Sequence, residues 1–371
     1  MIEIKHLNKS QLEIFVESQD FRNLDFIPIS KHRANSHCKN PRLNEEDILL
    51  FLAYENDILV GYLGALPDKI FINKQSDNCA WLSCLWINPE QRGKKIAQKL
   101  LDSCFNIWGN RILVTEFTDS AKYLYDKSQI FNPLSDKKGI RLYLKSDLQK
   151  ILPPKKELFQ KIKPLLSAFD FTVNLFLKLR LSLKKAKTTK IRPDSYRVEK
   201  VNEIDQEIID FISPKQKNEL FKRGKDELNW ILNNPWILSS PETIESKKYH
   251  FSSVENSFEF IPLKIYDSQN KLIAFILFAK RNNSLKIPYC YYDSENLIDV
   301  INVINQQILE LKISTFTTFQ TEISAYFSQN KSLAFHKKEI TRNYIISKDF
   351  GEEILTSKFE IQDGDADCSF T

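Results

Sequence analysis

The chain has 371 residues, of which 42% are hydrophobic and 27% are charged, and this composition excludes a disordered or membrane-spanning protein. The length favours two domains, because one hydrophobic core seldom serves so many residues. The net charge of +5 is unevenly distributed, since 150–192 holds twelve Lys or Arg and only two acids. The rest of the chain is therefore net acidic, and the basic character belongs to one segment.

The cysteines and the N-terminus indicate a reduced location. The six cysteines are scattered, without paired or metal-ligand spacing, so neither a disulfide nor a metal site is expected. The chain starts directly with an alternating strand instead of a basic, then apolar, leader. We therefore expect no signal peptide and a cytoplasmic protein.

The first part of the chain predicts strands that alternate with helices. The expected strands lie at 2–7, 48–54, 58–64, 80–88 and 111–117, with terminal strands up to 144. The expected helices begin after Ser10, at about 93 and at Ser120, and 29–44 is expected to be a polar loop. This alternation indicates an α/β domain over 1–148.

The second part repeats this order after a connector. Residues 149–193 are rich in Leu, Phe and Lys and predict a basic helical connector. Strands are then expected near 258–266, 271–280, 285–292 and 313–319, helices at 294–312 and 320–328, and two last strands within 333–347. We therefore expect a second domain over 194–349, followed by a flexible acidic tail at 350–371.

The turn from the strand at 80–88 into the next helix carries the chemistry. Arg92, Lys94 and Lys95 crowd the helix start, where each cation costs up to about 0.3–1 kcal/mol unless an anion is bound. Amides and cations at a helix N-terminus together bind pyrophosphate, and Gly93 lets a ligand approach the backbone. The alternative is a solvated basic first turn.

The segment 88–97 resembles the CoA-pyrophosphate loop of the GNAT acetyltransferases, whose pattern is Arg/Gln-x-x-Gly-x-Gly/Ala. Arg92 and Ala97 match that pattern. Lys95 stands where the family usually has glycine. Binding of pyrophosphate is expected to be weaker than usual for that reason.

A second resemblance lies about 20 residues further on. The segment 121–130 is similar to the family's Ala-x-x-Leu-Tyr-Glu-Lys-x-Gly-Phe helix, with Tyr125 on the tyrosine and Gln129 in place of the glycine. In that family the tyrosine faces the CoA sulfur. A phenol of pKa about 10 can protonate a thiolate of pKa about 8.5, so the resemblance makes Tyr125 a general acid.

The resemblance implies a mixed α/β sheet of the GNAT fold, in two tandem copies joined by the helical connector. It implies acetyl-CoA or another acyl-CoA as co-substrate, attacked directly by an amine. A backbone amide near Leu85 to Ile87 would stabilise the oxyanion, and Glu116 is our candidate general base. The implied cofactor-binding residues are Leu85, Trp86, Ile87, Arg92, Gly93, Lys94, Lys95, Ile96 and Ala97.

The acceptor is less well defined. A small-molecule or glycan amine is expected, with an amino sugar or a cell-surface glycan precursor favoured. The segment 227–236 holds two tryptophans that either stack on a sugar or pack in a core. His32, His37 and Cys38 either line an acceptor pocket or are ordinary loop residues.

The basic segment 155–187 has two interpretations. As an amphipathic helix it would lie on an anionic membrane, which predicts a peripheral position at the inner face. Otherwise it is a connector buried between the domains, and the alternation at 175–183 also permits a strand.

The second half is expected to be degenerate, because Asp293 and Glu295 at its equivalent helix start repel phosphate. Two rival functions remain: a Fem-type aminoacyl transferase and a non-catalytic scaffold. Binding to nucleic acid is not expected.

Overall fold

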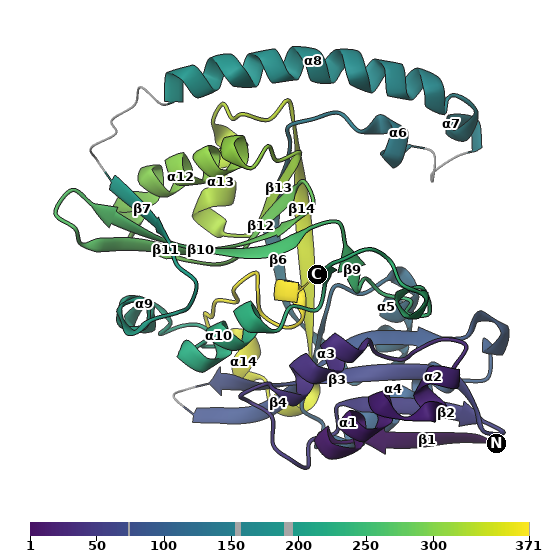
Figure 1. Ribbon diagram of the computed structural model, residues 1–371. Helices are drawn as coiled ribbons and strands as arrows, with labels where there is room; N and C mark the ends of the chain where they lie inside the picture. Colours follow the sequence, from purple (N-terminus) through teal and green to yellow (C-terminus); the bar gives the residue numbers. More distant parts are fainter. Residues whose placement is uncertain (73–74, 153–156, 189–195, 371) are drawn as a thin grey trace. The chain divides into compact units, whose positions relative to one another are not determined.

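The computed structural model describes residues 1–72, 75–152, 157–188 and 196–370, and they form two compact units (Figure 1). Unit 1 contains 1–137, 203–259 and the chain from 341 onward. Unit 2 contains 138–202 and 260–340. These units cross the predicted boundaries at 148, 193 and 349, because strands are exchanged between the two halves of the chain.

Unit 1 is built on a mixed sheet in the order β1-β2-β3-β4-β5-β14. Its strands are β1 (Ile2–Leu7), β2 (Leu50–Glu55), β3 (Ile58–Ile72), β4 (Gln75–Ile87), β5 (Ile112–Thr115) and the second half of β14 (His336–Ser347). Its N-terminal helices are α1 (Lys9–Glu17), α2 (Gln19–Asn23), α3 (Lys31–Cys38), α4 (Ile96–Ile107) and α5 (Asp119–Ser128). Strands β3 and β4 are longer than predicted.

Both faces of this sheet are buried. Along β2, Leu50 and Leu52 pack with α1 and α3, whereas Phe51 and Ala53 pack with α4. Successive side chains of a strand point to opposite faces, so β2 is apolar throughout and helices cover both sides of the sheet. The α4 positions that pack are Ile96, Leu100, Leu101 and Cys104, which lie on one side of the helix.

The segment 203–259 adds shorter elements to unit 1. They are α9 (Gln206–Ile212), α10 (Lys225–Asn233), β8 (Leu238–Ser239), α11 (Ile244–Lys247) and β9 (Val254–Glu255). Tyr249 joins the core on the α1 and α3 face.

Unit 2 repeats the strand–helix order in the sheet β6-β13-β12-β11-β10-β7. Its strands are the second half of β6 (Phe131–Tyr143), β7 (Tyr196–Lys200), β10 (Phe258–Asp267), β11 (Leu272–Arg281), β12 (Ser284–Tyr292) and β13 (Thr315–Thr318). Helices α12 (Leu297–Glu310) and α13 (Thr321–Gln329) pack on it around Val300, Ile304 and Phe327.

The exchange involves the last strand of each half. Strand β6 follows α5 in the chain but pairs with β13, through Leu142 and Phe316. Strand β14 follows α13 but pairs with β5, through Ile345 and Val114. The predicted pair of last strands within 333–347 is in fact the single strand β14. Each half of the chain thus completes the other's sheet.

The connector is helical, as predicted, with α6 (Leu148–Ile151), α7 (Glu157–Lys161) and α8 (Lys163–Thr188). The strand alternative at 175–183 is wrong, because these residues lie within α8. The parts of the predicted connector at 153–156 and 189–193 lie outside the described residues.

Two segments predicted to be irregular and exposed are packed instead. The expected loop at 29–44 contains α3, whose Arg33, Ser36 and His37 are buried. The expected flexible tail contains α14 (Glu353–Thr356), and its residues Ile361 and Phe370 are buried as well. The sequence of neither segment shows a hydrophobic period, because many of their buried side chains are polar and are held by specific partners. Hydrophobic periodicity therefore could not predict that they are packed.

Candidate functional site

Strands β4 and β5 separate at the centre of unit 1. They pair in parallel only at Ala80 with Ile112 and Trp81 with Leu113. Beyond this point β4 has a bulge, at which Leu63 of β3 faces both Cys84 and Leu85, and the φ of Cys84 is +55°. A bulge bends its strand, so a gap opens beside β4 after Trp81.

Backbone donors of β4 border this gap. The N–H of Asn88 donates to the carbonyl of Val60 on β3, at 2.9 Å. Because successive N–H groups point to opposite sides of a strand, the N–H of Ile87 points away from β3. The side chain of Trp86 is occupied by ring contacts with Phe26 and His250, at 4.4 and 4.0 Å, so the backbone is what this part of β4 offers a ligand.

The turn after β4 is shaped by local caps. The Asn88 side chain accepts from the N–H of Glu90, at 3.0 Å, and starts a short 3-10 turn at 89–91. Gly93 follows with φ +86°, and no atom lies within 4 Å of where its Cβ would stand. A side chain there would be strained by the backbone alone. The glycine therefore leaves an open, exposed approach to the start of α4.

Both departures from the family's glycines adopt the conformation that glycine favours. Lys95 is left-handed, with φ +60°, directly before α4. Gln129 is left-handed, with φ +58°, at the end of α5. Left-handed backbone costs a non-glycine residue about 1–2 kcal/mol. The backbone of the motif is thus kept at both positions, at some cost in stability.

The cations of the turn remain at the surface. The side chains of Arg92, Lys94 and Lys95 are exposed, and Ile96 is buried beneath them. Lys94 pairs with Glu55 at the end of β2, with 2.6 Å between Nζ and Oε2. A bound pyrophosphate would compete with Glu55 for this lysine. The residues present nevertheless fit an anion, because cations, an open glycine and the first amides of α4 converge.

Tyr125 lies on α5 and is buried. Its ring has edge contacts with Phe117 and Phe131, at 5.7 and 5.3 Å between centroids. Burial, and then the nearby Cys104 and Asp367, raise the pKa of Tyr125. The phenol is therefore held in its protonated form, as a proton donor requires.

Glu116, the predicted base, is in an ion pair. Its Oε1 lies 2.5 Å from Nη2 of Arg342 on β14, and Arg342 also pairs with Asp363. A base must accept a proton, which would here cost the ion pair. The geometry favours a role for Glu116 in holding β14 and the C-terminal segment.

The structure brings a different carboxylate to the gap. Asp367 accepts a hydrogen bond from the Ser83 hydroxyl at 2.5 Å, one residue before the bulged Cys84. The guanidinium of Arg33 donates to Ser83 at 2.6 Å and lies 2.6 Å from the Cys84 sulfur. Burial raises the pKa of Asp367, and Arg33 and Ser83 only partly offset this.

Sequence reasoning missed Asp367 because it lies in the segment expected to be flexible. No periodic pattern marks 351–370. The signal that remained was compositional, because 360–367 holds four acids and no cation.

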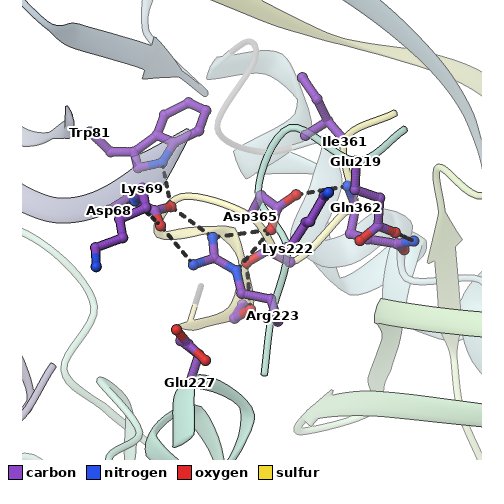
Figure 2. A network of polar contacts seen from close by, with 12 residues as sticks. Asp68, Lys69, Trp81, Glu219, Lys222, Arg223, Glu227, Ile361, Gln362 and Asp365 are labelled. Atoms are coloured by element: carbon purple, nitrogen blue, oxygen red, sulfur yellow. Dashed lines mark hydrogen bonds and ion pairs between the residues drawn. The ribbon is translucent and has the colours of Figure 1, made fainter. Parts of the chain in front are cut away.

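A buried ionic network anchors this C-terminal segment (Figure 2). Asp68 of β3 accepts from Arg223, at 2.9 and 2.7 Å, from Trp81 at 3.0 Å and from Arg42. The Nε of Arg223 donates to Asp365 at 3.1 Å. Arg223 therefore joins the sheet to the segment that carries Asp367.

The two carboxylates of this network have opposite shifts. Burial alone would raise the pKa of Asp68, but Arg223 and Arg42 hold it at about 2. For Asp365, burial prevails over Arg223 and raises the pKa to about 6. Asp68 is thus a fixed charge, and Asp365 titrates near neutral pH.

The two tryptophans of 227–236, which were expected either to stack on a sugar acceptor or to pack in a core, are packed in the core. Trp230 and Trp236 are buried, and their indole N–H groups donate to the Ser36 carbonyl and hydroxyl, at 2.8 and 2.9 Å. Core packing, the alternative to a sugar face, is correct for both. Trp236 stacks on Phe370 at 4.3 Å.

His32, His37 and Cys38 lie on α3 and not in a loop. His32 bonds through Nε2 to the Trp236 carbonyl, at 2.7 Å. Burial, together with Arg33, holds the pKa of His37 well below its usual value. Among the described residues, no group of His, Cys, Asp or Glu could hold a metal ion.

No helix in the described part of the chain is both long and apolar enough to cross a bilayer.

Comparison with known proteins agrees with this geometry. Residues 14–127 match the model of the acetyltransferase (GNAT) family. A probable N-acyltransferase of unknown function from Enterococcus faecalis is 10% identical, with 93% of this chain and 72% of that chain covered and a TM-score of 0.54. A GCN5-related N-acetyltransferase from Anabaena variabilis is 14% identical, with the same two coverages and a TM-score of 0.52. No curated protein matches the sequence.

The family model covers the gap between β4 and β5, the basic turn and Tyr125. The two solved structures extend the likeness of fold over nearly the whole chain. The chain therefore has the GNAT fold in two tandem copies, and residues 14–127 form a domain of the acetyltransferase (GNAT) family.

Proposed function

We propose that unit 1 transfers an acyl group from acyl-CoA, with acetyl-CoA the expected donor, to the nitrogen of an amine. The observation that carries this proposal is the basic, glycine-bearing turn at the start of α4, beside the gap between β4 and β5. In this proposal Arg92, Lys94 and the amides of 95–97 bind the pyrophosphate. The thioester would lie along β4, at Leu85 to Ile87.

The chemistry proceeds by direct attack on the thioester. Asp367 accepts a proton from the acceptor's ammonium group, and the freed nitrogen attacks the thioester carbon. The N–H of Ile87 donates to the oxyanion that forms. When the carbon–sulfur bond breaks, Tyr125 gives its proton to the departing thiolate. The attacking nitrogen then loses its second proton, which restores the phenol of Tyr125 through solvent and leaves a neutral amide.

Asp367 replaces Glu116 as the proposed base for a physical reason. A raised pKa makes a carboxylate a better base near neutral pH, and Asp367 has one. Asp367 also contributes to the raised pKa of Tyr125, which supports a shared site for the two groups.

The acceptor remains an amine of a small molecule or glycan. The argument for an amino sugar or a cell-surface glycan precursor as the acceptor now depends on membrane attachment alone, because Trp230 and Trp236 are buried and cannot stack on a sugar. The proposed location is the cytoplasm, with peripheral attachment at the inner face of the membrane.

Calorimetric titration with acetyl-CoA tests the proposal. The wild-type protein should bind, and Arg92→Ala combined with Lys94→Ala should bind about 10–100-fold more weakly, because charge-assisted hydrogen bonds are lost. The matched control is Lys331→Ala combined with Lys338→Ala, two exposed lysines of unit 2, which should bind as the wild type does. No binding by the wild type would reject acyl transfer and favour a non-catalytic scaffold.

A further inference from the structure

The outward side of helix α8 is apolar. Six large hydrophobic side chains of α8 are between 53% and 71% exposed, namely Leu165, Phe169, Phe171, Leu175, Phe176 and Leu179. Phe171 and Leu175 stand at the edge of this side and also line a cavity next to the helix. Exposed apolar residues are ordinary when scattered but not when contiguous. Leu165, Phe169, Phe176 and Leu179 recur at spacings that place them on one side of the helix, with only Thr172 between them.

The opposite side of α8 packs on unit 2. Leu177 and Asp170 are buried there. The Asn174 side chain bonds to both the N–H and the carbonyl of Ser146, each at 2.8 Å. The helix is therefore fixed by its inner side, and its apolar outer side faces away from the rest of unit 2.

Cations stand at the borders of the apolar side. With 100° between successive residues, Lys178 and Arg180 fall on opposite edges, between the outer and inner sides. Lys161 and Lys163 are exposed near the start of the helix. An apolar side between basic edges is the pattern of a helix that lies in the surface of an anionic bilayer.

A cavity of about 710 Å³ lies beneath one edge of α8, against α12 and 144–149. Its apolar lining includes Leu144, Phe171 and Ile308, and its cations are Lys145, Lys178 and Lys312. An apolar cavity with three cations fits a lipid whose headgroup carries a phosphate.

The carboxylates near this cavity should repel a bound phosphate only weakly, because each of them has hydrogen-bond donors or another partner. Asp170 accepts from the Ser146 hydroxyl at 2.5 Å and from the N–H groups of Leu148 and Gln149, at 3.0 and 2.9 Å. Glu310 of α12 is exposed and accepts from Gln306 and Gln307. Asp147 precedes α6 and also has a partner.

We infer that the outer side of α8 and the basic cavity beneath it dock unit 2 on an anionic phospholipid bilayer. The apolar side chains enter the acyl boundary, and Lys145, Lys178 and Lys312 bind lipid phosphate. A bilayer explains both features together, whereas the apolar side alone would also fit a second copy of the chain.

The inference deepens the location part of the proposed function and can fail separately from it. Lipid docking depends on residues of unit 2, and binding of acetyl-CoA depends on the turn of unit 1. Titration with acetyl-CoA and sedimentation with vesicles therefore report on different surfaces.

Vesicle co-sedimentation of the full chain tests the inference. The protein should bind phosphatidylcholine vesicles that contain phosphatidylserine and should bind pure phosphatidylcholine much less. Lys145→Gln, Lys178→Gln and Lys312→Gln together should weaken binding about 100-fold, at about fivefold for each lysine. Lys331→Gln with Lys338→Gln, on exposed lysines elsewhere in unit 2, should leave binding unchanged.

A second pair of variants separates the apolar contribution. Phe169→Ser with Phe176→Ser should abolish vesicle binding, while Ile298→Ser, at an exposed apolar residue of α12, should not. Equal binding to both kinds of vesicle, or no binding to either, would overturn the inference. So would a dimer of the wild type, seen by light scattering, that the two Phe substitutions dissociate without any effect on vesicles.

Discussion

The two units carry the same strand-to-helix turn with opposite chemistry. In unit 1, β4 leads through Arg92, Gly93, Lys94 and Lys95 into α4. In unit 2, β12 leads through 293–296 into α12, and this turn has two acids, no glycine and no left-handed residue. Carboxylates at a helix start satisfy the macrodipole and repel phosphate. The fold thus supplies a turn, and the side chains decide whether an anion can bind.

The two units also differ at the bulge of the strand before the turn and at the place of Tyr125. In β12, Phe278 of β11 faces both Ile287 and Pro288, as Leu63 faces two residues in β4. Proline has no N–H, so unit 2 lacks a donor at the place of Leu85. The place of Ile87, the proposed oxyanion donor, is taken by Cys290. Counted from the N-cap residues Thr118 and Gln320, Phe327 of α13 occupies the place of Tyr125 and has no proton to give. Unit 2 therefore lacks the basic turn and the tyrosine that are proposed to act in unit 1.

The largest expected effect comes from Asp367, the proposed base. Asp367→Asn should lower kcat about 10²–10⁴-fold, because a general base is lost. The affinity for acetyl-CoA should not change. Steady-state kinetics and calorimetry on the same preparation measure both.

Glu116→Gln is the control for Asp367. It removes the ion pair with Arg342 and should lower stability more than kcat. If Glu116→Gln lost activity while Asp367→Asn kept it, the base would be Glu116.

Tyr125→Phe gives α5 of unit 1 the residue type that stands at the equivalent place, Phe327, in α13 of unit 2. The loss in kcat should be about 10²-fold, at the lower end for a general acid, because solvent can also protonate a thiolate. Because the raised pKa keeps the phenol protonated across the working pH range, the shape of the pH–rate profile should not change. Tyr123→Phe, at an exposed tyrosine of the same helix, should leave the rate and the profile unchanged.

The pH dependence of stability should reveal Asp365. Its folded pKa of about 6 lies above an unfolded value of about 3.9, so its contribution is complete below pH 4 and is lost as the pH rises through 6. From pH 4.5 to 7.5 this should cost about 2 kcal/mol. Urea unfolding of wild type and Asp365→Asn at both pH values measures the difference, which should move in favour of Asn at the higher pH. A constant difference would contradict the raised pKa.

The smallest effect concerns the strained turn. Lys95→Gly should raise the free energy of unfolding by about 0.5–1 kcal/mol, because relief from left-handed strain exceeds the entropy that glycine costs. Gln129→Gly should do the same at the end of α5. Lys94→Gly removes an equal charge from a residue whose backbone is not left-handed, and it should lower the free energy of unfolding. Thermal unfolding of the three variants would show whether backbone strain or charge decides the sign of the change in the free energy of unfolding.

Hydrophobic periodicity predicted most regular elements, because burial of one face imposes a period on strands and helices. Both copies of the strand–helix order follow from it, as in β10, β11 and α12. The resemblance of 88–97 and 121–130 to GNAT motifs likewise pointed to the turn and to Tyr125. Lys95 and Gln129 stand where the family has glycine, and both have left-handed backbone. The sequence predicted a weaker site at Lys95 and did not predict this conformation.

Only the tertiary structure decided which strand completes which sheet and what fills the site. Strands β6 and β14 have similar patterns, so periodicity cannot tell which partner each one pairs with. Arg33, Arg223 and Asp367 are polar and lie outside any period, and their burial depends on partners far away in the sequence. The sequence alone determined most of the regular elements and the basic turn before α4. Long-range polar pairing, which leaves no local pattern, decided the position of the C-terminal segment and of the proposed base.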